Sequence, residues 1–548
     1  MRGLISAAAV LCALCAAVLA GEFDALPVAP GQADAAPPSP GGGAPSGGAA
    51  SGGGASPAAK SAPNILVIVT DDQRQLNVRK AMPQTAKHVT RRGTRFTESF
   101  VTTPVCCPSR ATLLTGQYAH NHGALSNHKG YERLVDKENV LPVWLQRAGY
   151  VTAHLGKFLN GYEVEVDSPA EIAPGWDRWF TQLTPRLYWN YALAVDGRIG
   201  LYPDADEDHL TLNLNRQTGK LVRQMAELPQ PFYIQLDHFA PHREWDLPSP
   251  EGRCVGHARP SREHEDLFKR EPLVKPPSFN ERNVSDKPSF IRRRPRLNER
   301  KKRKVQRGQR CALASLRTVD AGVRRIVEIL RDTGELENTA IVVTSDNGFL
   351  FGEHRIPRNK GVPYEEALRV PLAIRVPKRF RDGDRVAASS EMVANIDLAP
   401  TILDLAGADP CRTPSACRTL DGRSLLPLLG EKGGAWPENR AIGIEYSLVG
   451  APSQYGTCEY NGIRVPRHSY VHHTRGAALK ESCEPIDEHE LYDLREDPYQ
   501  LHNLLHPPVA PEDFVRTGQL ASRAAKLSKC RGIKGRDPEP PGPARHCE

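Results

Sequence analysis

After residue 20 the sequence lacks any apolar run long enough to cross a lipid bilayer, which needs about 20 consecutive apolar residues. It also lacks the biased composition of fibrous or disordered chains, because 39% of its residues are hydrophobic and 25% are charged. These values exclude collagen, coiled coil and wholesale disorder as descriptions of the whole chain. At roughly 150 residues per domain, a chain of 548 residues predicts several domains or one large domain.

The first residues have the pattern of a secretory signal peptide. An apolar run at 4–19 follows Met1 and Arg2, and small residues at its end favour cleavage after Ala20. The alternative, a membrane anchor, would require a longer apolar stretch. Residues 21–62 then predict a flexible linker, because almost every residue from 29 onward is Ala, Gly, Pro or Ser. We therefore expect a protein that is secreted and soluble after cleavage near Ala20.

The chain contains twelve cysteines, of which Cys12 and Cys15 lie in the predicted signal peptide. An oxidising compartment makes disulfides plausible for the others, although sequence alone does not determine the connectivity. Pairing between near neighbours would join 411 with 417, 458 with 483 and 530 with 547, and would leave 254 with 311. The adjacent residues Cys106 and Cys107 stand apart, because neighbouring cysteines rarely bridge each other without strain.

Two strands buried on both faces are predicted at 64–70 and 339–345, where apolar and β-branched residues form unbroken runs. Each strand is followed by side chains with oxygen donors, namely Asp71 and Asp72 after the first and Asp346 and Asn347 after the second. In open α/β sheets, ligands bind beyond the carboxyl ends of the strands. The two pairs are therefore expected to build one site.

Further elements support an α/β architecture. Apolar residues recur at spacings of three and four between 313 and 330, which predicts an amphipathic helix leading into the strand at 339–345. A third strand is predicted at 230–236, and His238 and His242 follow it at the same edge. Short strands at 441–445, 469–473 and 490–493 predict a smaller carboxy-terminal subdomain, whereas the tail beyond residue 507 is expected to pack weakly.

Residues 292–310 carry eleven Lys and Arg side chains against the single acid Glu299. This local excess of about ten positive charges exceeds the net charge of +8 for the whole chain, so the remainder is close to neutral. Two interpretations are open: a solvated insertion loop, or an electrostatic collar for a polyanion.

The segment from Cys106 to Gly116 carries the most specific pattern, Cys-Cys-Pro-Ser-Arg-Ala-Thr-Leu-Leu-Thr-Gly. It resembles the type I sulfatase signature Cys-x-Pro-Ser-Arg-x-x-x-Leu-Thr-Gly, in which the first cysteine is oxidised to formylglycine. The resemblance implies that Cys106 is the modified residue and that Cys107 occupies the variable position. Pro108 favours a first helical turn, so Cys106 is expected at a helix amino terminus, where unpaired N–H groups attract anions such as sulfate.

The resemblance extends from residue 63 to about 505 and implies the fold, the cofactors and the site. The implied fold is an alkaline-phosphatase-like three-layer α/β sandwich with a large, mostly parallel central sheet and a smaller carboxy-terminal α+β subdomain. The predicted divisions are a signal peptide at 1–20, a linker at 21–62, a catalytic domain at 63–434 with the basic insertion 292–310, a subdomain at 435–505 and a tail at 506–548.

By the same resemblance, a divalent cation, usually Ca²⁺, is held by oxygen donors and by the modified residue. Oxygen donors are what a hard cation requires. The implied metal ligands are Asp71, Asp72, Cys106, Asp346 and Asn347, and the implied catalytic residues are Cys106, Arg110, Lys157, His242 and Lys360. Lys157, Asn160 and Lys360 are the implied substrate contacts.

Several segments follow the N-acetylglucosamine-6-sulfatase and heparan endosulfatase branch of the family. Many sulfatases have a histidine two residues after the lysine that corresponds to Lys157, whereas this chain has Leu159 and then Asn160, as in that branch. His242 is the candidate general acid, with His238 and His354 as alternatives and His154 expected to be structural. The branch favours a sulfated amino sugar, as in a glycosaminoglycan, although aryl sulfates are also possible substrates.

The implied reaction is nucleophilic catalysis by the aldehyde hydrate at residue 106, after maturation by a formylglycine-generating enzyme. One alternative is a phosphate or phosphonate ester hydrolase on the same scaffold. Another is a secreted, non-catalytic polyanion-binding protein that uses residues 292–310. We expect neither a nucleic-acid partner nor a membrane span.

Overall fold

The computed structural model describes residues 62–75, 78–244, 252–448, 456–477, 482–531, 533–534 and 547. The predicted signal peptide and the predicted linker as far as residue 61 lie outside these ranges. Among the described helices, none is both long and apolar enough to cross a membrane.

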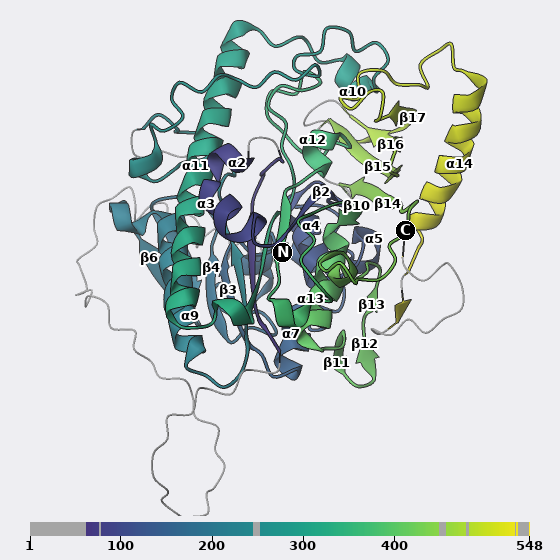
Figure 1. The fold of residues 1–548 in the computed structure, drawn as a ribbon. Helices are drawn as coiled ribbons and strands as arrows, with labels where there is room; N and C mark the ends of the chain where they lie inside the picture. Colours follow the sequence, from purple (N-terminus) through teal and green to yellow (C-terminus); the bar gives the residue numbers. More distant parts are fainter. Residues whose placement is uncertain are drawn as a thin grey trace, which may run out of the picture. The chain divides into compact units, whose positions relative to one another are not determined.

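A mixed sheet of ten strands organises the described residues (Figure 1). Its strands run in the order β10 (Ala388–Ala394), β2 (Thr94–Phe100), β9 (Leu372–Arg375), β8 (Thr339–Ser345), β1 (Asn64–Thr70), β7 (Phe232–Asp237), β3 (Val151–Gly156), β4 (Arg178–Gln182), β5 (Tyr191–Val195) and β6 (Arg198–Tyr202). The central strands β8, β1, β7, β3 and β4 pair in parallel. The predicted strands at 64–70, 230–236 and 339–345 correspond to β1, β7 and β8.

Helices cover both faces of this sheet, and β1 contributes alternate side chains to each face. Ile65, Val67 and Val69 pack with α4 (Cys106–Thr115), α7 (Leu141–Arg147) and α13 (Leu398–Ala406). Leu66 and Ile68 pack on the opposite face with α9 (Leu210–Ala226) and α11 (Glu299–Asp332). The predicted three-layer α/β sandwich is therefore confirmed. Shorter helices connect the layers: α2 (Val78–Ala81), α3 (Pro83–Thr85), α5 (Ala119–His122), α6 (Gly130–Arg133), α8 (Tyr162–Glu165), α10 (Ser289–Arg292) and α12 (Glu365–Leu368).

Helix α11 contains the amphipathic helix predicted at 313–330, but it begins earlier, at Glu299. The Asn298 side chain caps it by accepting a hydrogen bond from the Lys301 backbone N–H at 3.0 Å. Val305 and Ala312 are buried and extend the apolar stripe toward the amino terminus. Residues 299–310 are thus helical, and the interpretation of the basic stretch as a loop is wrong for this part.

The smaller sheet predicted near the carboxyl end is present as four antiparallel strands. They are β14 (Ile442–Ser447), β15 (Thr457–Arg464), β16 (His468–Gly476) and β17 (Glu484–Asp493). Strand β15 was not predicted, because its sequence mixes polar residues and glycine with few apolar ones. Two small sheets pair β11 (Cys411–Thr413) with β12 (Ala416–Cys417) and β13 (Thr419–Leu420) with β18 (Ile533–Lys534). The predicted boundary at residue 435 stays a prediction.

The expectation of a weakly packed tail is wrong for the residues that form α14 (Pro511–Leu527). Leu520, Ala524 and Leu527 are buried and join the hydrophobic cluster of the carboxy-terminal sheet, along which α14 lies in Figure 1. The apolar residues of α14 are spaced at three and four, which the high content of proline and charge around them conceals.

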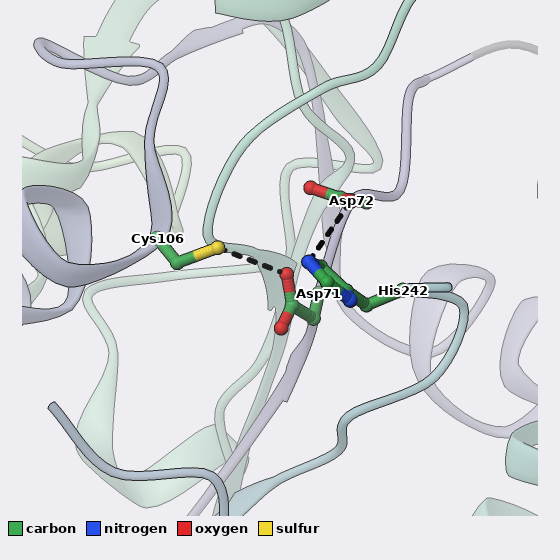
Figure 2. Close-up of side chains that lie close together, drawn as sticks. All are labelled: Asp71, Asp72, Cys106 and His242. Carbon is green, nitrogen blue, oxygen red and sulfur yellow. Dashed lines mark hydrogen bonds and ion pairs between the residues drawn. The ribbon is translucent and has the colours of Figure 1, made fainter. Parts of the chain in front are cut away.

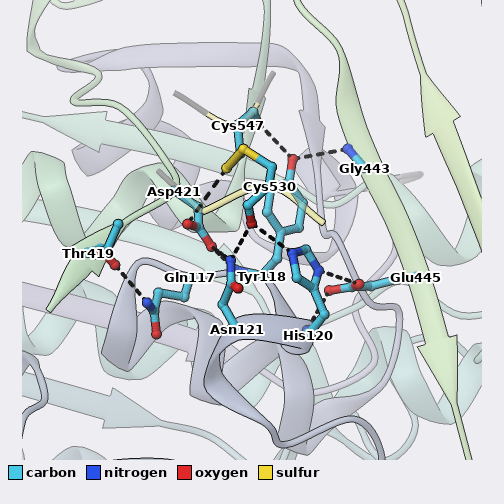
Figure 3. Close-up of a disulfide and its surroundings, with 10 residues drawn as sticks. All are labelled: Gln117, Tyr118, His120, Asn121, Thr419, Asp421, Gly443, Glu445, Cys530 and Cys547. Carbon is cyan, nitrogen blue, oxygen red and sulfur yellow. Dashed lines mark hydrogen bonds and ion pairs between the residues drawn. A yellow bond between two sulfur atoms is a disulfide. The ribbon is translucent and has the colours of Figure 1, made fainter. Parts of the chain in front are cut away.

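Among the described residues, four disulfides are present, and they join the pairs suggested by the sequence. The pairs are 254 with 311, 411 with 417, 458 with 483, and 530 with 547. In Figure 3 the last of these lies beside α5, where the Tyr118 hydroxyl donates to the Cys547 carbonyl at 3.1 Å and Asn121 donates to the Cys530 carbonyl at 2.7 Å. Cys106 and Cys107 are the free cysteines of the described residues.

Candidate active site

The carboxyl ends of β1 and β8 bring the two predicted pairs of oxygen donors together. The strands are parallel, and Thr70 is in register with Ser345. The Asp72 backbone N–H donates to Asp346 Oδ1 at 3.2 Å, and Asn347 Nδ2 donates to Asp72 Oδ1 at 2.7 Å. The side chains that were expected to build one site are thus in hydrogen-bond contact.

Cys106 is the first residue of α4, at the helix amino terminus expected from Pro108. Its Sγ atom lies 3.2 Å from Asp71 Oδ1, toward which it points in Figure 2. Complete burial, followed by the negative charge of Asp71, raises the pKa of the Cys106 thiol to about 12. The unmodified sulfur would therefore remain a thiol at neutral pH and would be a weak nucleophile.

Arg110, one helical turn after Cys106, connects three strand ends. Its Nε atom donates to Asp346 Oδ2 at 2.8 Å, and its Nη1 atom lies 3.4 Å from Asp237 Oδ2. The same Nη1 donates to the Lys157 carbonyl at 2.8 Å. The guanidinium is almost completely buried, so it orients these groups from a fixed position.

Two lysines complete the cluster. Lys157 follows β3 at Gly156, where a Cβ atom would lie 2.0 Å from the Asp237 carbonyl, and its ammonium pairs with Asp71. Lys360 comes from the loop after β8, and its ammonium pairs with Asp72 and lies 2.6 Å from Cys106 Sγ. Both side chains are buried, which places two positive charges beside residue 106.

The carboxylates of the cluster differ in their electrostatic state. Burial opposes ionisation of Asp71, but Lys157 and the other nearby cations hold its pKa well below the usual value. Burial raises the pKa of Asp72, and burial together with Asp71 raises the pKa of Asp346 to about 6. The cations of the cluster therefore stabilise the ionised form of Asp71, but they do not fully stabilise the ionised forms of Asp72 and Asp346.

This donor set fits a hard divalent cation. Asp71, Asp72, Cys106 and His242 each offer a ligand atom, and these atoms lie within 4.8 Å of one another; the two carboxylates of this group are the donors that suit a hard cation. The Lys360 ammonium lies among the same oxygens, 3.6 Å from Asp71 Oδ1 and in an ion pair with Asp72. An ammonium surrounded by carboxylate oxygens marks a place where positive charge is stabilised, and such oxygens are the ligands that Ca²⁺ and Mg²⁺ prefer.

His242 borders the cluster, with Nε2 3.7 Å from Asp72 Oδ2 (Figure 2). Its Nδ1 atom lies 2.6 Å from the Arg243 carbonyl, which can only accept, so Nδ1 carries the proton in this contact. Burial lowers the pKa of the ring well below its usual value, although Asp71 opposes this effect. The neutral ring therefore turns the lone pair of Nε2 toward the site.

The other predicted histidines occupy different surroundings. His238 is buried directly after β7, and burial lowers its pKa to about 3. His354 bonds Glu281 at 2.8 Å, and His154 bonds Thr181 at 2.7 Å. His154 packs among aromatic rings and also donates from Nε2 to Asp237 at 3.1 Å, so its expected structural role stays a prediction.

Asn160 lies beside Cys107, the residue that follows Cys106. Its carbonyl accepts a hydrogen bond from the Tyr131 backbone N–H at 3.0 Å, and its side-chain Oδ1 atom is buried without a hydrogen-bond partner among the described residues. The Cys107 backbone N–H donates to Asn127 Oδ1 at 2.9 Å. The substrate contact predicted for Asn160 stays a prediction.

Asp237 belongs to the cluster but was not assigned a role from the sequence. It ends β7, pairs with Arg110 and accepts a hydrogen bond from His154 Nε2 at 3.1 Å. The argument that identified Asp71 and Asp346, an acid at the carboxyl end of a buried strand, applies equally to Asp237 and could have found it.

Comparison with known proteins identifies the family to which this chain belongs. A family model described as sulfatase matches residues 63–408. The chain belongs to the sulfatase family. A second model, described as the carboxy-terminal part of N-sulphoglucosamine sulphohydrolase, matches residues 352–517.

Named relatives of this sulfatase include animal proteins. An extracellular sulfatase Sulf-1 homolog of Caenorhabditis elegans is 34% identical over 377 residues, which cover 67% of this chain and 49% of that protein. The chain thus spans about half the length of that relative. Human N-acetylglucosamine-6-sulfatase is 28% identical over 88% of this chain and 87% of its own length.

A solved structure with the same fold has a TM-score of 0.67 and 23% identity, and covers 86% of this chain and 98% of its own. That protein is described in complex with its substrate D-glucosamine-2-N,6-O-disulfate. The predicted sandwich with a large, mostly parallel sheet is thus shared with this solved structure.

Proposed function

We propose that this sulfatase is a secreted enzyme that hydrolyses sulfate esters, with sulfated amino sugars as the preferred class. The observation that carries the proposal is the position of Cys106, buried at a helix amino terminus between carboxylates and two lysine ammonium groups. A thiol with so high a pKa serves nucleophilic chemistry poorly. Conversion of Cys106 to formylglycine would supply, as the aldehyde hydrate, one hydroxyl for attack on sulfur and a second for release of sulfate.

The residues around Cys106 have complementary roles in the proposal. Asp71, Asp72, Asp346 and Asn347 would hold the divalent cation, for which we propose Ca²⁺, beside residue 106. A divalent cation bound there supplies positive charge that favours deprotonation of a nearby hydroxyl. Arg110 keeps these carboxylates oriented through its bond to Asp346.

Lys157 and Lys360 would bind the sulfuryl oxygens of the substrate. Their ammonium groups are buried, held by Asp71 and Asp72, and therefore fixed before the substrate arrives. Preorganised charge of this kind stabilises the negative charge that gathers on the sulfuryl oxygens in the transition state.

His242 would donate a proton to the departing oxygen of the sugar. Burial lowers the pKa of its ring, so an imidazolium formed there is a strong acid, and the anionic sulfate ester favours its formation. Its Nε2 faces the site, while Nδ1 is held by the Arg243 carbonyl.

The surroundings of the site support a polyanionic substrate. A hollow that begins at Asp72 is lined by Arg243 and Arg358 and by Gly308 and Ala312 of α11. The preceding turns of α11 carry the exposed basic residues of the 292–310 stretch. A sulfated polymer entering the site from this side would meet positive charge along α11. The relatives named for glucosamine sulfates point to the same substrate class.

Export is part of the proposal. The sequence at 1–20 has the features of a cleaved signal peptide, and the Caenorhabditis elegans relative is described as extracellular. Maturation would require a formylglycine-generating enzyme in the producing cell.

The experiment compares turnover of N-acetylglucosamine-6-sulfate, an aryl sulfate, an aryl phosphate and an aryl phosphonate by enzyme saturated with Ca²⁺. We expect sulfate esters to be cleaved with the higher kcat/KM and the sugar ester to be preferred. Cys106→Ala, with unchanged circular dichroism, should lose turnover of all four. A higher kcat/KM for the phosphonate would refute sulfatase activity, whereas binding of sulfated polymer without turnover would favour a binding protein.

A further inference from the structure

We propose that the carboxy-terminal sheet carries a second metal site, in which His472, Asp487 and His489 bind a divalent transition-metal ion of the Zn²⁺ class. The site lies on strands β16 and β17 and shares no residue with the catalytic cluster. The ligand atoms of the three side chains lie within 4.8 Å of one another.

The pairing of the strands creates this arrangement. His472 and His489 are directly opposite each other in the antiparallel pair β16–β17. Asp487 precedes His489 by two residues and therefore projects from the same face of the sheet. The two imidazole rings are stacked, with centroids 4.2 Å apart and an interplanar angle of 13°. The backbone register, rather than a mobile loop, thus sets the separation of the two rings.

The ligand atoms already converge. His472 Nε2 lies 2.8 Å from Asp487 Oδ1, and His489 Nε2 lies 3.0 Å from the same oxygen. Bonds from Zn²⁺ to nitrogen and oxygen of about 2.0–2.1 Å at tetrahedral angles separate neighbouring ligand atoms by about 3.3 Å. An ion would therefore need these contacts to open by only about half an ångström. All three side chains are accessible to solvent, with Asp487 82% exposed, so they can make this adjustment.

The donor set selects the class of metal. Two imidazole nitrogens and one carboxylate oxygen suit Zn²⁺, Cu²⁺ or Ni²⁺, whereas Ca²⁺ and Mg²⁺ prefer ligand shells of oxygen alone. In the catalytic cluster, the oxygen donors proposed for the cation, those of Asp71, Asp72, Asp346 and Asn347, favour Ca²⁺ or Mg²⁺ instead. The two sites should accordingly respond differently to Ca²⁺ and Zn²⁺.

The neighbouring residue Tyr470 is placed to orient one of the two histidines for metal binding. The buried Tyr470 hydroxyl lies 2.9 Å from His489 Nδ1. When a metal replaces the Nε2–H contact to Asp487, the hydroxyl can accept the Nδ1 proton, so that the Nε2 lone pair binds the metal; such contacts to the other ring nitrogen are the rule for metal-bound histidines. Tyr470 is thus a positioning residue for His489.

The test is a calorimetric titration of the full chain with Zn²⁺, after chelator treatment and in saturating Ca²⁺, which occupies the catalytic cluster. We expect one Zn²⁺ site in the wild type. His472→Gln and His489→Gln should weaken it by more than about tenfold, since even residues behind the ligands contribute 10–100-fold to affinity. Sulfate ester turnover in Ca²⁺ should be unchanged in both variants. His502→Gln, which removes an exposed histidine outside the sheet, is the matched control and should bind Zn²⁺ as the wild type does.

Cu²⁺ provides a second readout that does not depend on affinity. Its electron paramagnetic resonance spectrum should show coordination by two imidazole nitrogens in the wild type and by one in His489→Gln. Tyr470→Phe should retain both nitrogens but bind Zn²⁺ about tenfold more weakly. Equal Zn²⁺ affinity in the wild type and in the two ligand variants, with no loss of a nitrogen signal, would overturn the proposal. Because the Zn²⁺ and Cu²⁺ readouts need no turnover, they remain valid if the proposed sulfatase activity fails.

Discussion

Replacement of Lys360 by methionine tests whether the positive charge of this side chain serves catalysis or supports metal binding. Methionine has a similar volume and no charge, so the substitution removes the ammonium without opening a large cavity. That ammonium lies 2.6 Å from Cys106 Sγ and 3.6 Å from Asp71 Oδ1, and it pairs with Asp72. Lys360 therefore interacts both with the reacting residue and with the proposed metal ligands.

The substitution should lower kcat, but it should not lower the affinity for Ca²⁺. Loss of one preorganised charge beside the reacting group should lower kcat by about a hundred- to a thousandfold. A unit charge about 4 Å away contributes about 4 kcal/mol at an effective dielectric of 20, so the ammonium also repels a cation bound at Asp71 and Asp72. Its removal should leave Ca²⁺ affinity unchanged or higher. Without Ca²⁺ the variant leaves buried carboxylates unpaired, which should lower the free energy of unfolding by about 3–5 kcal/mol.

The assay combines sulfate ester kinetics, Ca²⁺ calorimetry and urea unfolding, each on Lys360→Met and on the control Lys378→Met. Lys378 is an exposed lysine on the same part of the chain, and its replacement should change none of these quantities. The reasoning is refuted if Lys360→Met turns over within about threefold of the wild type. It is equally refuted if the variant loses Ca²⁺ affinity, since the ammonium would then support the metal site rather than compete with it.

Three further predictions concern other parts of the structure. Asp71→Asn should weaken Ca²⁺ binding by more than about tenfold, as measured by calorimetry, since it removes a carboxylate whose pKa the nearby cations hold well below its usual value. Unchanged affinity would exclude Asp71 as a ligand. Cys107→Ala should keep full turnover and lose about 1 kcal/mol of stability, whereas abolished turnover in this variant alone would mean that Cys107 is the modified residue. Burial lowers the pKa of His120, but the hydrogen bond that its Nδ1–H donates to Glu445 outweighs burial and raises this pKa to about 9 (Figure 3). The contact should therefore add about 1.5–3 kcal/mol to the free energy of unfolding below pH 6.5, and this contribution should be lost as pH rises through 9. The thermal unfolding temperatures of His120→Gln and the wild type should then converge above pH 9. A difference that stays constant with pH would contradict this reasoning.

The parts of the fold that could be predicted are those with a strong local signal. The unbroken apolar runs of β1 and β8 identified both strands, and the oxygen-bearing residues that follow them lie together because parallel strands end at one edge. Pro108 indicated the helix that begins at Cys106. Local patterns were sufficient here because each one is satisfied within a single element.

Sequence reasoning failed where the decisive contacts come from distant segments. The basic residues at 299–310 hide the apolar positions Val305 and Ala312, which pack with Phe351, so the sequence left a loop open as one interpretation of a segment that is helical. The strand β15 shows no apolar run and is defined by its neighbours β14 and β16. The juxtaposition of Lys157 and Lys360 at Asp71 also depends on the folded sheet, and only the family resemblance connected them beforehand.

The chemical state of residue 106 is the most direct test of the proposed function. The enzyme should be purified from cells that contain a formylglycine-generating enzyme, and the peptide that contains residue 106 analysed by mass spectrometry after trapping with a hydrazide. We predict an aldehyde at residue 106, an unmodified thiol at Cys107, and sulfate ester turnover that rises in proportion to the aldehyde content. An intact thiol at Cys106 in fully active enzyme would contradict the account.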